Sequence, residues 1–362
     1  MTAAVRRPSA SGRAPKSVIK TSIVRISRES GPIPSVAFVL CKALAALQLV
    51  LALYVVPQLV VRPRWPAVLA FAGSLLRPAR VSVPALGLDV AVDDLISRDA
   101  WANVVGVPLL HVATLVCGNL FFAALYWLRL PAVEACRAGA ETGPWHFARE
   151  AGAARNAAFW ANARSSVIAT LLNVALTVPL AALNYDLSVR LGHRADAASF
   201  PSTPSVLAHM LFFALAEDCL FYWGHRTLHS SAALYARVHK QHHAWVQSSA
   251  IAAEATHPLE FVICNVVPFA AGPLLSGAHL SLLYLWLTWR VTETVAHHSG
   301  YELPTDMFAI LPFQGDARAH DLHHARGGAV GGKSGNFGSF SKFWDTVMGT
   351  VIPDPTLTEV AH

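Results

Sequence analysis

The sequence predicts an all-α integral membrane protein with about four transmembrane helices, a short membrane-dipping hairpin and a cytosolic histidine-rich region. The first observation is composition: 54% of the 362 residues are hydrophobic and 14% are charged, whereas soluble domains carry about 25% charged residues. The second is a series of long apolar runs. The third is that histidines gather directly after the fourth run. Membrane contact is therefore expected, and a nucleic-acid partner is not.

The chain begins with a basic segment and a first apolar run. Residues 1–35 are rich in Ser, Pro and Arg without apolar periodicity, which predicts a disordered tail, although a mitochondrial transit peptide has a similar composition. Residues 36–61 are too long for a signal-peptide core and predict the first span. A basic tail beside a span usually stays in the cytosol.

Further runs complete the membrane region. Residues 62–102 mix Pro, Arg and Asp with short apolar runs, so they stay unassigned between loop and interfacial helix. Spans two to four are expected at 104–130, 166–183 and 206–223. Four crossings from a cytosolic tail return the chain to the cytosol, where the histidines follow.

A pair of shorter runs, 261–275 and 278–289, is expected to form a re-entrant hairpin or two steeply packed spans. In either case the chain returns to the side from which it entered. The histidines before and after the hairpin can therefore meet.

The histidines form three clusters with helical spacing. The clusters are His225 and His229; His239, His242 and His243; and His320, His323 and His324. Residues three and four apart share a helix face, so each cluster is expected to direct its imidazoles at one point. A lone histidine on an apolar face is usually structural, but three such clusters favour metal binding. They exceed the ligands of one tetrahedral ion, which indicates two metals.

Carboxylates flank these clusters at the ends of apolar runs: Glu217, Asp218, Glu260 and Glu293. One interpretation is that they accept the free N–H of a ligating imidazole and so orient it. The other is an interfacial salt bridge, for example between Glu293 and Arg290. His257 is a further ligand or a supporting donor, and both interpretations stay open.

Six segments carry a resemblance to a known family. EDCLFYWGHRTLH, LYARVHKQHH, ATHPLE, WRVTETVAHHSGYELP, HDLHH and FWDTVMGT resemble the fatty acid hydroxylase and sterol desaturase superfamily. The run 290–304, R-x-x-E-T-x-x-x-H-S-G-Y-x-x-P, is most similar to the 4-methylsterol monooxygenases. The resemblance covers roughly 205–353, which implies a catalytic domain there, a membrane region at 36–204 and a C-terminal tail at 354–362.

The resemblance implies a non-haem di-iron enzyme of the endoplasmic reticulum membrane, with its catalytic histidines facing the cytosol. It also implies that His298 joins the eight clustered histidines as a ligand, while the role of His297 stays open. The implied reaction oxidises the C-4 methyl group of a 4-methyl or 4,4-dimethyl sterol with O2. Its electrons come from NAD(P)H through a carrier such as cytochrome b5 and its reductase, because no segment resembles a haem or flavin domain. All-histidine ligation also suits zinc, which a preparation could contain.

Several alternatives stay open. Within the superfamily, the chain could be another di-iron lipid hydroxylase or a sterol desaturase. A divalent-metal transporter would place its histidines at mid-membrane depth, and a zinc hydrolase would need an HExxH pattern. A sterol is expected to enter from the bilayer past Phe221, Tyr222 and Trp223, unless these are interfacial anchors. The Gly-rich insertion 327–335 is a lid or, more simply, a surface loop.

Overall fold

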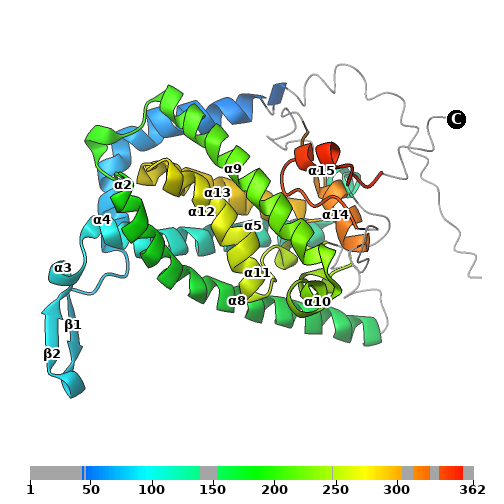
Figure 1. Cartoon of the computed structure of the whole chain (residues 1–362), viewed down its shortest axis with the longest axis horizontal. Coiled ribbons are helices and arrows are strands. Elements are labelled where there is room, and N and C mark those ends of the chain that lie inside the picture. The colour runs from blue at the N-terminus through cyan, green and yellow to red at the C-terminus, as the bar shows by residue number, and fades with distance from the viewer. Residues whose placement is uncertain are drawn as a thin grey trace, which may run out of the picture. The chain divides into compact units, whose positions relative to one another are not determined.

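The computed structural model describes residues 43–44, 46–138, 153–246, 248–303, 313–326 and 334–353. These residues belong to one compact unit that begins at Cys41. The predicted tails at 1–35 and 354–362, and most of the Gly-rich insertion, lie outside the described residues. Apart from one two-stranded hairpin, the described elements are helices, which confirms the all-α prediction (Figure 1).

Five described helices are long and apolar enough to cross a membrane. They are Ala46–Ser74, Arg98–Leu128, Phe159–Arg190, Thr203–Ser230 and Pro258–Leu275. The first four correspond to the four predicted spans, and the fifth is the first arm of the predicted hairpin. The chain is therefore a multi-pass membrane protein.

The first span continues beyond its expected end. It contains the π-helix η1 (Leu51–Val61) and the helix α2 (Arg62–Ser74). Pro57 lies within η1 and has no N–H to donate to the helical ladder, a known cause of local widening. Trp65 Nε1 donates to the carbonyl of Ala195 at 2.7 Å, so α2 is held against the far end of the third span.

A small antiparallel hairpin follows, which the sequence did not indicate. It consists of β1 (Arg80–Val83), η2 (Pro84–Leu86) and β2 (Leu88–Ala91), with Arg80 opposite Ala91. Its residues lie in the segment left unassigned between loop and interfacial helix. The short helices that lead into the second span are α3 (Val92–Leu95), α4 (Arg98–Trp101) and η3 (Ala102–Gly106).

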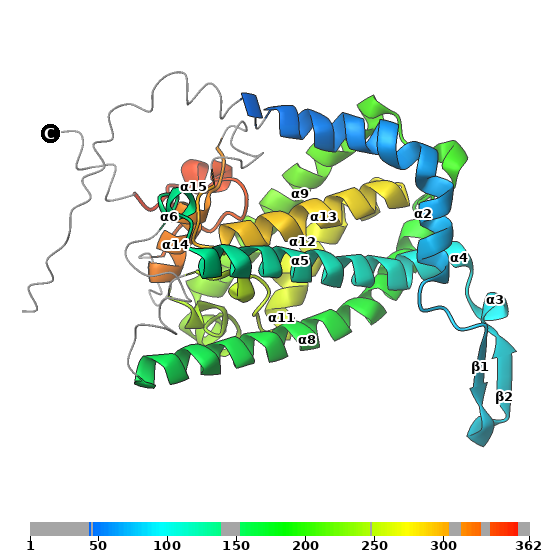
Figure 2. The same ribbon diagram turned by 180° about the vertical axis from the view of Figure 1, so that it is seen from behind.

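The remaining long helices form the body of the unit (Figures 1 and 2). They are α5 (Val107–Leu128), α8 (Ala153–Arg190), α9 (Thr203–Ser230), α12 (Val267–Leu275) and α13 (Leu280–His297). Helix α12 packs on α9, and α13 packs on α5. A side chain at Gly272 would place its Cβ 2.7 Å from Cα of Phe213, so this glycine allows the close approach of α12 and α9.

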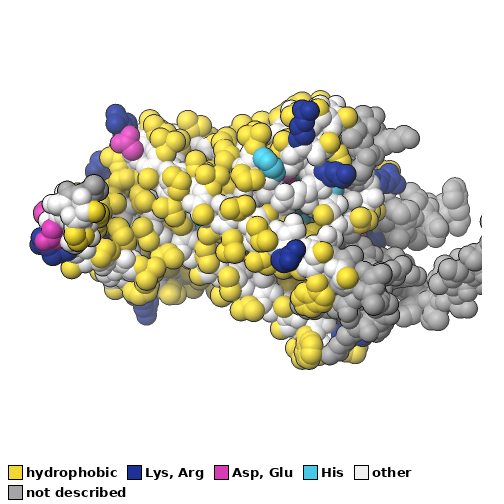
Figure 3. Space-filling model, turned by 90° about the horizontal axis from the view of Figure 1, so that it is seen from below, with side chains coloured by type: hydrophobic (Ala, Val, Ile, Leu, Met, Phe, Trp, Pro, Cys, Tyr) yellow, Lys and Arg dark blue, Asp and Glu magenta, His cyan; other side chains and the backbone are white. Residues whose placement is uncertain are grey.

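The hairpin is packed inside the helices around it. Its second arm contributes Leu282 and Trp286 to a buried cluster with Val206, Met210 and Phe213 of α9. By contrast, large apolar side chains such as Leu120 and Leu171 are more than half exposed. Figure 3 shows hydrophobic side chains over the middle of the unit and most Lys and Arg toward its ends, the distribution of a lipid-facing surface.

Short elements gather where α9 and α13 end (Figure 2). They are α10 (Ala232–Leu234), η5 (Tyr235–His239), η6 (His242–Ala244), η7 (Ala250–Ala252), α14 (Ala317–Arg326) and α15 (Phe343–Met348). The hairpin's first arm starts there with α11 (Pro258–Glu260) and η8 (Phe261–Val266). Two further short elements are α6 (Pro131–Glu134) and η4 (Ala197–Ser199). The hairpin thus leaves and returns at one end, as the sequence predicted.

Candidate metal centre

Nine buried histidines form two adjacent groups at this end of the helices. The five-histidine group contains His225, His229, His239, His243 and His323, and the four-histidine group contains His242, His298, His320 and His324. In each group, one nitrogen of every ring lies within 4.8 Å of the others. These nine residues are the ones that the sequence and the family resemblance nominated.

The tautomers of the five-histidine group follow from the partners of Nδ1. His225 Nδ1 lies 2.9 Å from the carbonyl oxygen of Phe337, and His323 Nδ1 lies 2.7 Å from that of Gly335. A carbonyl accepts only, so each Nδ1 carries the proton and donates it. The Nε2 atoms of these neutral rings therefore carry bare lone pairs.

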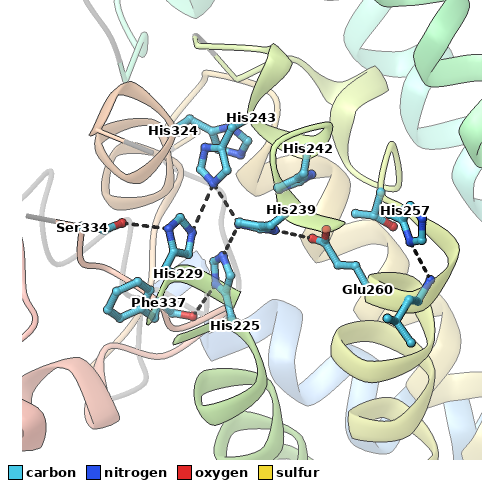
Figure 4. A network of polar contacts seen from close by, with 12 residues as sticks. His225, His229, His239, His242, His243, His257, Glu260, His324, Ser334 and Phe337 are labelled. Carbon is cyan, nitrogen blue, oxygen red and sulfur yellow. Dashed lines mark hydrogen bonds and ion pairs between the residues drawn. The ribbon is translucent and has the colours of Figure 1, made fainter. Parts of the chain in front are cut away.

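The Nε2 atoms of four of these rings form a chain of short contacts (Figure 4). His225 Nε2 lies 3.1 Å from His239 Nε2, which lies 2.9 Å from His243 Nε2, which in turn lies 3.3 Å from His229 Nε2. His239 Nδ1 donates to the carboxylate of Glu260, so the Nε2 atoms of both His225 and His239 are bare. Bare nitrogens at this distance repel unless a cation lies between them. Two ligands at the Zn–N distance of about 2.0–2.1 Å from one ion are separated by about this much. The donor set therefore fits a bound metal ion.

The four-histidine group repeats this arrangement. His298 Nδ1 donates to the carbonyl of Thr294 at 2.7 Å, and His324 Nδ1 donates to that of Trp245 at 3.0 Å. Their Nε2 atoms lie 2.8 and 3.0 Å from Nε2 of His320, respectively. His242 Nε2 completes the set at 3.4 Å from His298 Nε2. This group also fits a metal ion.

The rings are held in the neutral form that binds metals. Burial lowers the pKa of His298 to about 4. Burial, together with neighbouring imidazoles, also lowers the pKa of the other histidines outside the spans: His239, His242, His243, His320, His323 and His324. Metal binding at pH 7 therefore requires no deprotonation of these rings.

Each histidine trio is divided between the two groups, so the expectation that one trio points at one place is wrong. His239 and His243 enter the five-histidine group, whereas His242 enters the other. His320 and His324 enter the four-histidine group, whereas His323 enters the first. In α14 the i+3 and i+4 residues diverge because successive helix residues point about 100° apart. In the first trio His239 ends η5 and His242 begins η6, so no single helix aligns the three rings.

The loop after α14 supplies two of the carbonyls that orient the rings. Asp345 is fully buried, and its carboxylate accepts from the backbone N–H groups of Phe337 at 2.9 Å and Gly338 at 2.8 Å. Asn336 donates to the carbonyl of Ala319 at 2.9 Å and accepts from the N–H of Ile352 at 2.8 Å. The loop is therefore fixed relative to α14 and α15.

The predicted carboxylates have different partners. Glu260 Oε1 lies 2.8 Å from His239 Nδ1, the contact expected of a carboxylate that orients a ligand. Glu217 and Glu293 both pair with Arg290, as the salt-bridge interpretation proposed for Glu293. Glu293 also contacts His297 Nδ1 at 2.7 Å. Asp218 is buried, and its Oδ1 has no hydrogen-bond partner among the described residues.

The two histidines of uncertain role lie outside both groups. His257 caps α11 and accepts from the N–H of Leu259 at 3.1 Å, and Figure 4 shows it away from the converging rings. His297 lines a cavity beside the four-histidine group and belongs to the pair with Glu293. The structure therefore assigns neither ring to the two groups of converging nitrogens.

Two neighbouring cavities lie between the histidine groups and the membrane region. The inner cavity is lined by histidines of both groups, among them His225 and His298. The outer cavity lies among α5, α8, α9, α12 and α13. Asn265 and Thr294 line both cavities, so these two side chains lie at the boundary between them. The apolar helices thus enclose a space that adjoins the histidines.

The three aromatic residues expected at the neck behave differently. Phe221 lines the inner cavity, and its ring centroid lies 5.3 Å from that of His225. Tyr222 is instead fully buried against Trp344, and Trp223 is 41% exposed. Of the three, only Phe221 lines the inner cavity, because successive helix residues point about 100° apart. The exposed Trp223 agrees with the alternative of an interfacial anchor.

Sequence reasoning missed a buried pair in the outer cavity. His111 Nε2 lies 2.6 Å from Glu254 Oε1, and both residues are 6% exposed. The only signal was an isolated histidine in the apolar run VPLLHVATL. The ring-orienting carbonyls left no signal of their own, because any residue type has a carbonyl.

Comparison with known proteins identifies the family. Residues 210–350 match the fatty acid hydroxylase family. A very-long-chain aldehyde decarbonylase from Oryza sativa is 37% identical over 187 residues, which are 52% of this chain and 68% of the relative. The chain belongs to the fatty acid hydroxylase family.

Other relatives of this family are methylsterol monooxygenases. One from Arabidopsis thaliana is 37% identical over 180 residues, 50% of this chain and 65% of the relative. One from Danio rerio is 36% identical over 155 residues, 43% of this chain and 50% of the relative. No solved structure matched the chain. Fatty acid hydroxylase membership makes the chain an oxidoreductase of the membrane, with histidine groups compatible with metal binding.

Proposed function

We propose that the chain is a membrane-bound non-haem di-iron monooxygenase that oxidises the C-4 methyl group of 4-methyl or 4,4-dimethyl sterols. The observation that carries the proposal is the pair of histidine groups whose bare nitrogens converge beside a cavity from the membrane region. The five- and four-histidine groups would each hold one iron. Two irons there would supply the redox chemistry needed to use dioxygen and cleave a C–H bond.

The chain's own residues orient the ligands and exclude water. Glu260 and the carbonyls of Phe337, Gly335, Thr294 and Trp245 hold the rings through Nδ1. All nine rings are buried, so the inner cavity is shielded from bulk solvent on the histidine side. A dry cavity protects a reactive oxidant from side reactions.

The outer cavity suits the hydrocarbon body of a lipid. Its wall includes Leu180, Phe269, Leu283, Leu287 and Val291, and it lies between helices that cross the bilayer. Burial of apolar surface at about 25 cal/mol per Å² would favour entry of a sterol from the membrane. The substrate carbon to be oxidised would then point past Asn265 and Thr294 into the inner cavity.

A sterol is favoured by sequence as well as by shape. The run 290–304 resembles the methylsterol monooxygenases, and two relatives bearing that name match at 36–37% identity. The aldehyde decarbonylase match supports a second candidate within the family, an enzyme acting on a long-chain lipid. A metal transporter is disfavoured, since the histidines lie where α9 and α13 end rather than at mid-span.

Electrons would come from NAD(P)H through a separate carrier such as cytochrome b5 and its reductase. We place the enzyme in the endoplasmic reticulum membrane with the histidines facing the cytosol, because the basic N-terminal segment favours that orientation. The family match supports a catalytic domain at 205–353 after a membrane region at 36–204.

The test is reconstitution of the full chain, purified without chelator, with NAD(P)H, the two carrier proteins and O2. We expect about two irons per chain by elemental analysis, and conversion of a 4,4-dimethyl sterol to its C-4 hydroxymethyl product. Deletion of the gene should raise 4-methyl and 4,4-dimethyl sterols. A protein that leaves the sterol intact and consumes a long-chain aldehyde instead would contradict the sterol assignment.

A matched pair of histidine variants controls this experiment. His323→Ala removes a ring from the five-histidine group and should abolish both iron retention and turnover. His257→Asn removes a histidine that lies outside both groups and keeps an acceptor at the helix cap, so iron and turnover should be unchanged. If both variants lost iron and turnover equally, the converging rings would not be the metal ligands.

A further inference from the structure

The buried pair His111 and Glu254 lies in the wall of the outer cavity, apart from the converging histidines. Helix α5 supplies His111, and the segment between η7 and α11 supplies Glu254. Glu254 Oε1 is engaged by His111 Nε2, but Glu254 Oε2 is buried and has no hydrogen-bond partner among the described residues. A buried carboxylate oxygen without a donor costs free energy, so a missing donor is implied.

Glu254 is held in place from two sides. Its side chain is fixed by His111, and its backbone carbonyl accepts from Asn173 Nδ2 of α8 at 3.2 Å. The same Asn173 nitrogen contacts the carbonyl and hydroxyl of Thr256, at 3.0 and 3.2 Å. Rigid supports of this kind are typical of a polar group positioned to recognise a ligand.

The charged residues nearby do not supply the missing donor. Arg290 also lines the outer cavity, but its guanidinium is bonded to Glu217, Glu293 and Ser339. The carboxylate of Glu217 is therefore paired with an arginine, whereas that of Glu254 has only the imidazole of His111. An occupant of the cavity that carries a donor would complete the hydrogen bonding of Glu254 Oε2.

Glu254 lies close to the boundary between the inner and outer cavities. Its neighbours in sequence, Ala253 and Thr256, line the inner cavity, whereas Glu254 lines the outer one. A donor group held by Glu254 would therefore belong to the part of the ligand that is close to the inner cavity.

We propose that Glu254, positioned by His111, binds a hydroxyl group of the lipid substrate and selects hydroxylated lipids over carbonyl analogues. The proposal rests on the function proposed above and specifies how that site recognises its substrate. An ionised carboxylate accepts hydrogen bonds only, so it binds the O–H of an alcohol. A ketone or aldehyde oxygen has no proton to donate, and a ligand carboxylate would be repelled by Glu254. The site therefore favours a sterol alcohol over a long-chain aldehyde.

The test measures ligand binding in the iron-loaded full chain in lipid nanodiscs. Two ligand pairs are compared: a 4,4-dimethyl sterol with its 3-ketone, and a long-chain alcohol with the corresponding aldehyde. Hydrogen bonds to charged groups contribute about 1.5–3 kcal/mol, so the alcohol should bind about 10- to 100-fold more tightly than the carbonyl form. The 3-methyl ether of the sterol should bind as weakly as the ketone.

Glu254→Gln replaces the free oxygen with an N–H donor of the same size. The variant should lose most of the preference for alcohols and bind the ketone more tightly than the wild type does. A purely structural role would lower the affinity for both ligands equally. Thr177→Val is the matched control, because Thr177 lines the same cavity and bonds only within α8. It should leave the ratio unchanged.

The possible outcomes distinguish a failure of the hydroxyl site at Glu254 from a failure of the proposed sterol oxidation. No preference for alcohols in the wild type, or an altered preference in Glu217→Gln but not in Glu254→Gln, would overturn the hydroxyl site. Sterol turnover combined with an unchanged ratio in Glu254→Gln would do so too, and would leave the sterol function standing. Preference for the long-chain alcohol that depends on Glu254, without sterol binding, would support the site and reject the sterol. The wild-type ligand series decides the matter even where a variant fails to fold.

Discussion

Glu260 Oε1 lies 2.8 Å from Nδ1 of His239, so a buried carboxylate fixes the ring whose Nε2 has two histidine neighbours at about 3 Å. Loss of such a partner typically lowers metal affinity by about 10- to 100-fold. Glu260→Leu should show that loss, and Glu260→Gln a smaller one because its amide oxygen still accepts. Metal per chain, measured after dialysis against graded chelator, checks this. Asp186→Asn, which removes an exposed carboxylate on α8, is the control and should retain metal as the wild type does.

Gly335 occupies a position where the backbone passes close to its neighbour. A Cβ there would collide with the carbonyl oxygen of Thr350. Gly335→Ala should therefore displace the loop, remove the carbonyl that orients His323, and release metal from the five-histidine group. Elemental analysis and the melting temperature report both effects.

Gly87→Ala provides the comparison for this glycine. Gly87 has φ of 62° in the tip of the strand hairpin, and a Cβ there meets no neighbour. The left-handed conformation should cost about 1–2 kcal/mol in an alanine, without loss of metal. If Gly335→Ala kept its metal while Gly87→Ala lost it, the assignment of the ligand loop would be wrong.

Asp345 connects three groups of the ligand loop. Its carboxylate accepts from the N–H of Phe337, the N–H of Gly338 and the hydroxyl of Thr350, the last at 2.7 Å. Asp345→Asn places an N–H donor against one of these donors. We expect a loss of about 1.5–3 kcal/mol in the free energy of unfolding, as for hydrogen bonds to a charged group. Thermal melting in detergent measures it, and an unchanged melting temperature would contradict the role given to Asp345.

How far the sequence predicts this site depends on the kind of interaction. The spacing of His225 and His229, and of His239 and His243, predicts pairs on one helix face, and the structure brings both pairs into the five-histidine group. The sequence could not assign His242 to the other group, because that depends on how η5 and η6 meet α14. Tertiary packing, rather than local periodicity, decides it.

In the fold, too, local features were predictable from the sequence and tertiary contacts were not. Long apolar runs are recognised by their length and composition, so the existence of the spans was predictable, although the first span continues to Ser74 rather than ending at residue 61. The strand hairpin at 80–91 was not, because each strand has only four residues and only the first alternates between exposed and half-buried positions. The pair of His111 and Glu254 joins residues 143 positions apart, a separation at which a single sequence carries no contact information.

Acid should destabilise the metal-free protein. The pKa of His298 is about 4 in the folded state and about 6.5 in the unfolded chain, so between these values the unfolded state binds more protons. Stability is insensitive to this ring above pH 6.5 and falls as the pH drops from 6.5 toward 4. The other buried rings act in the same direction.

The measurement is the melting temperature of metal-free protein at pH 7.5, 6 and 5. We expect the melting temperature to decrease progressively with pH. The cause is a fall in the free energy of unfolding of up to about 1.4 kcal/mol per pH unit for each fully linked histidine. Saturating metal should shift the decrease to lower pH, since the metal competes with protons for the same nitrogens. A melting temperature that rose on acidification would contradict buried neutral rings.

Phe221 and Trp223 provide a test of which aromatic side chains contact substrate. Phe221 faces the inner cavity beside His225, whereas Trp223 is 41% exposed and packs edge-on against Trp344. Phe221→Leu enlarges the space next to the histidines, and apolar pockets discriminate by about 10-fold or more per methylene. It should therefore change the ratio of turnover rates for 4-methyl and 4,4-dimethyl sterols, whereas Trp223→Leu should not. Competition between the two sterols in one reaction measures the ratio directly, and a change confined to Trp223→Leu would move the substrate path to the other side of α9.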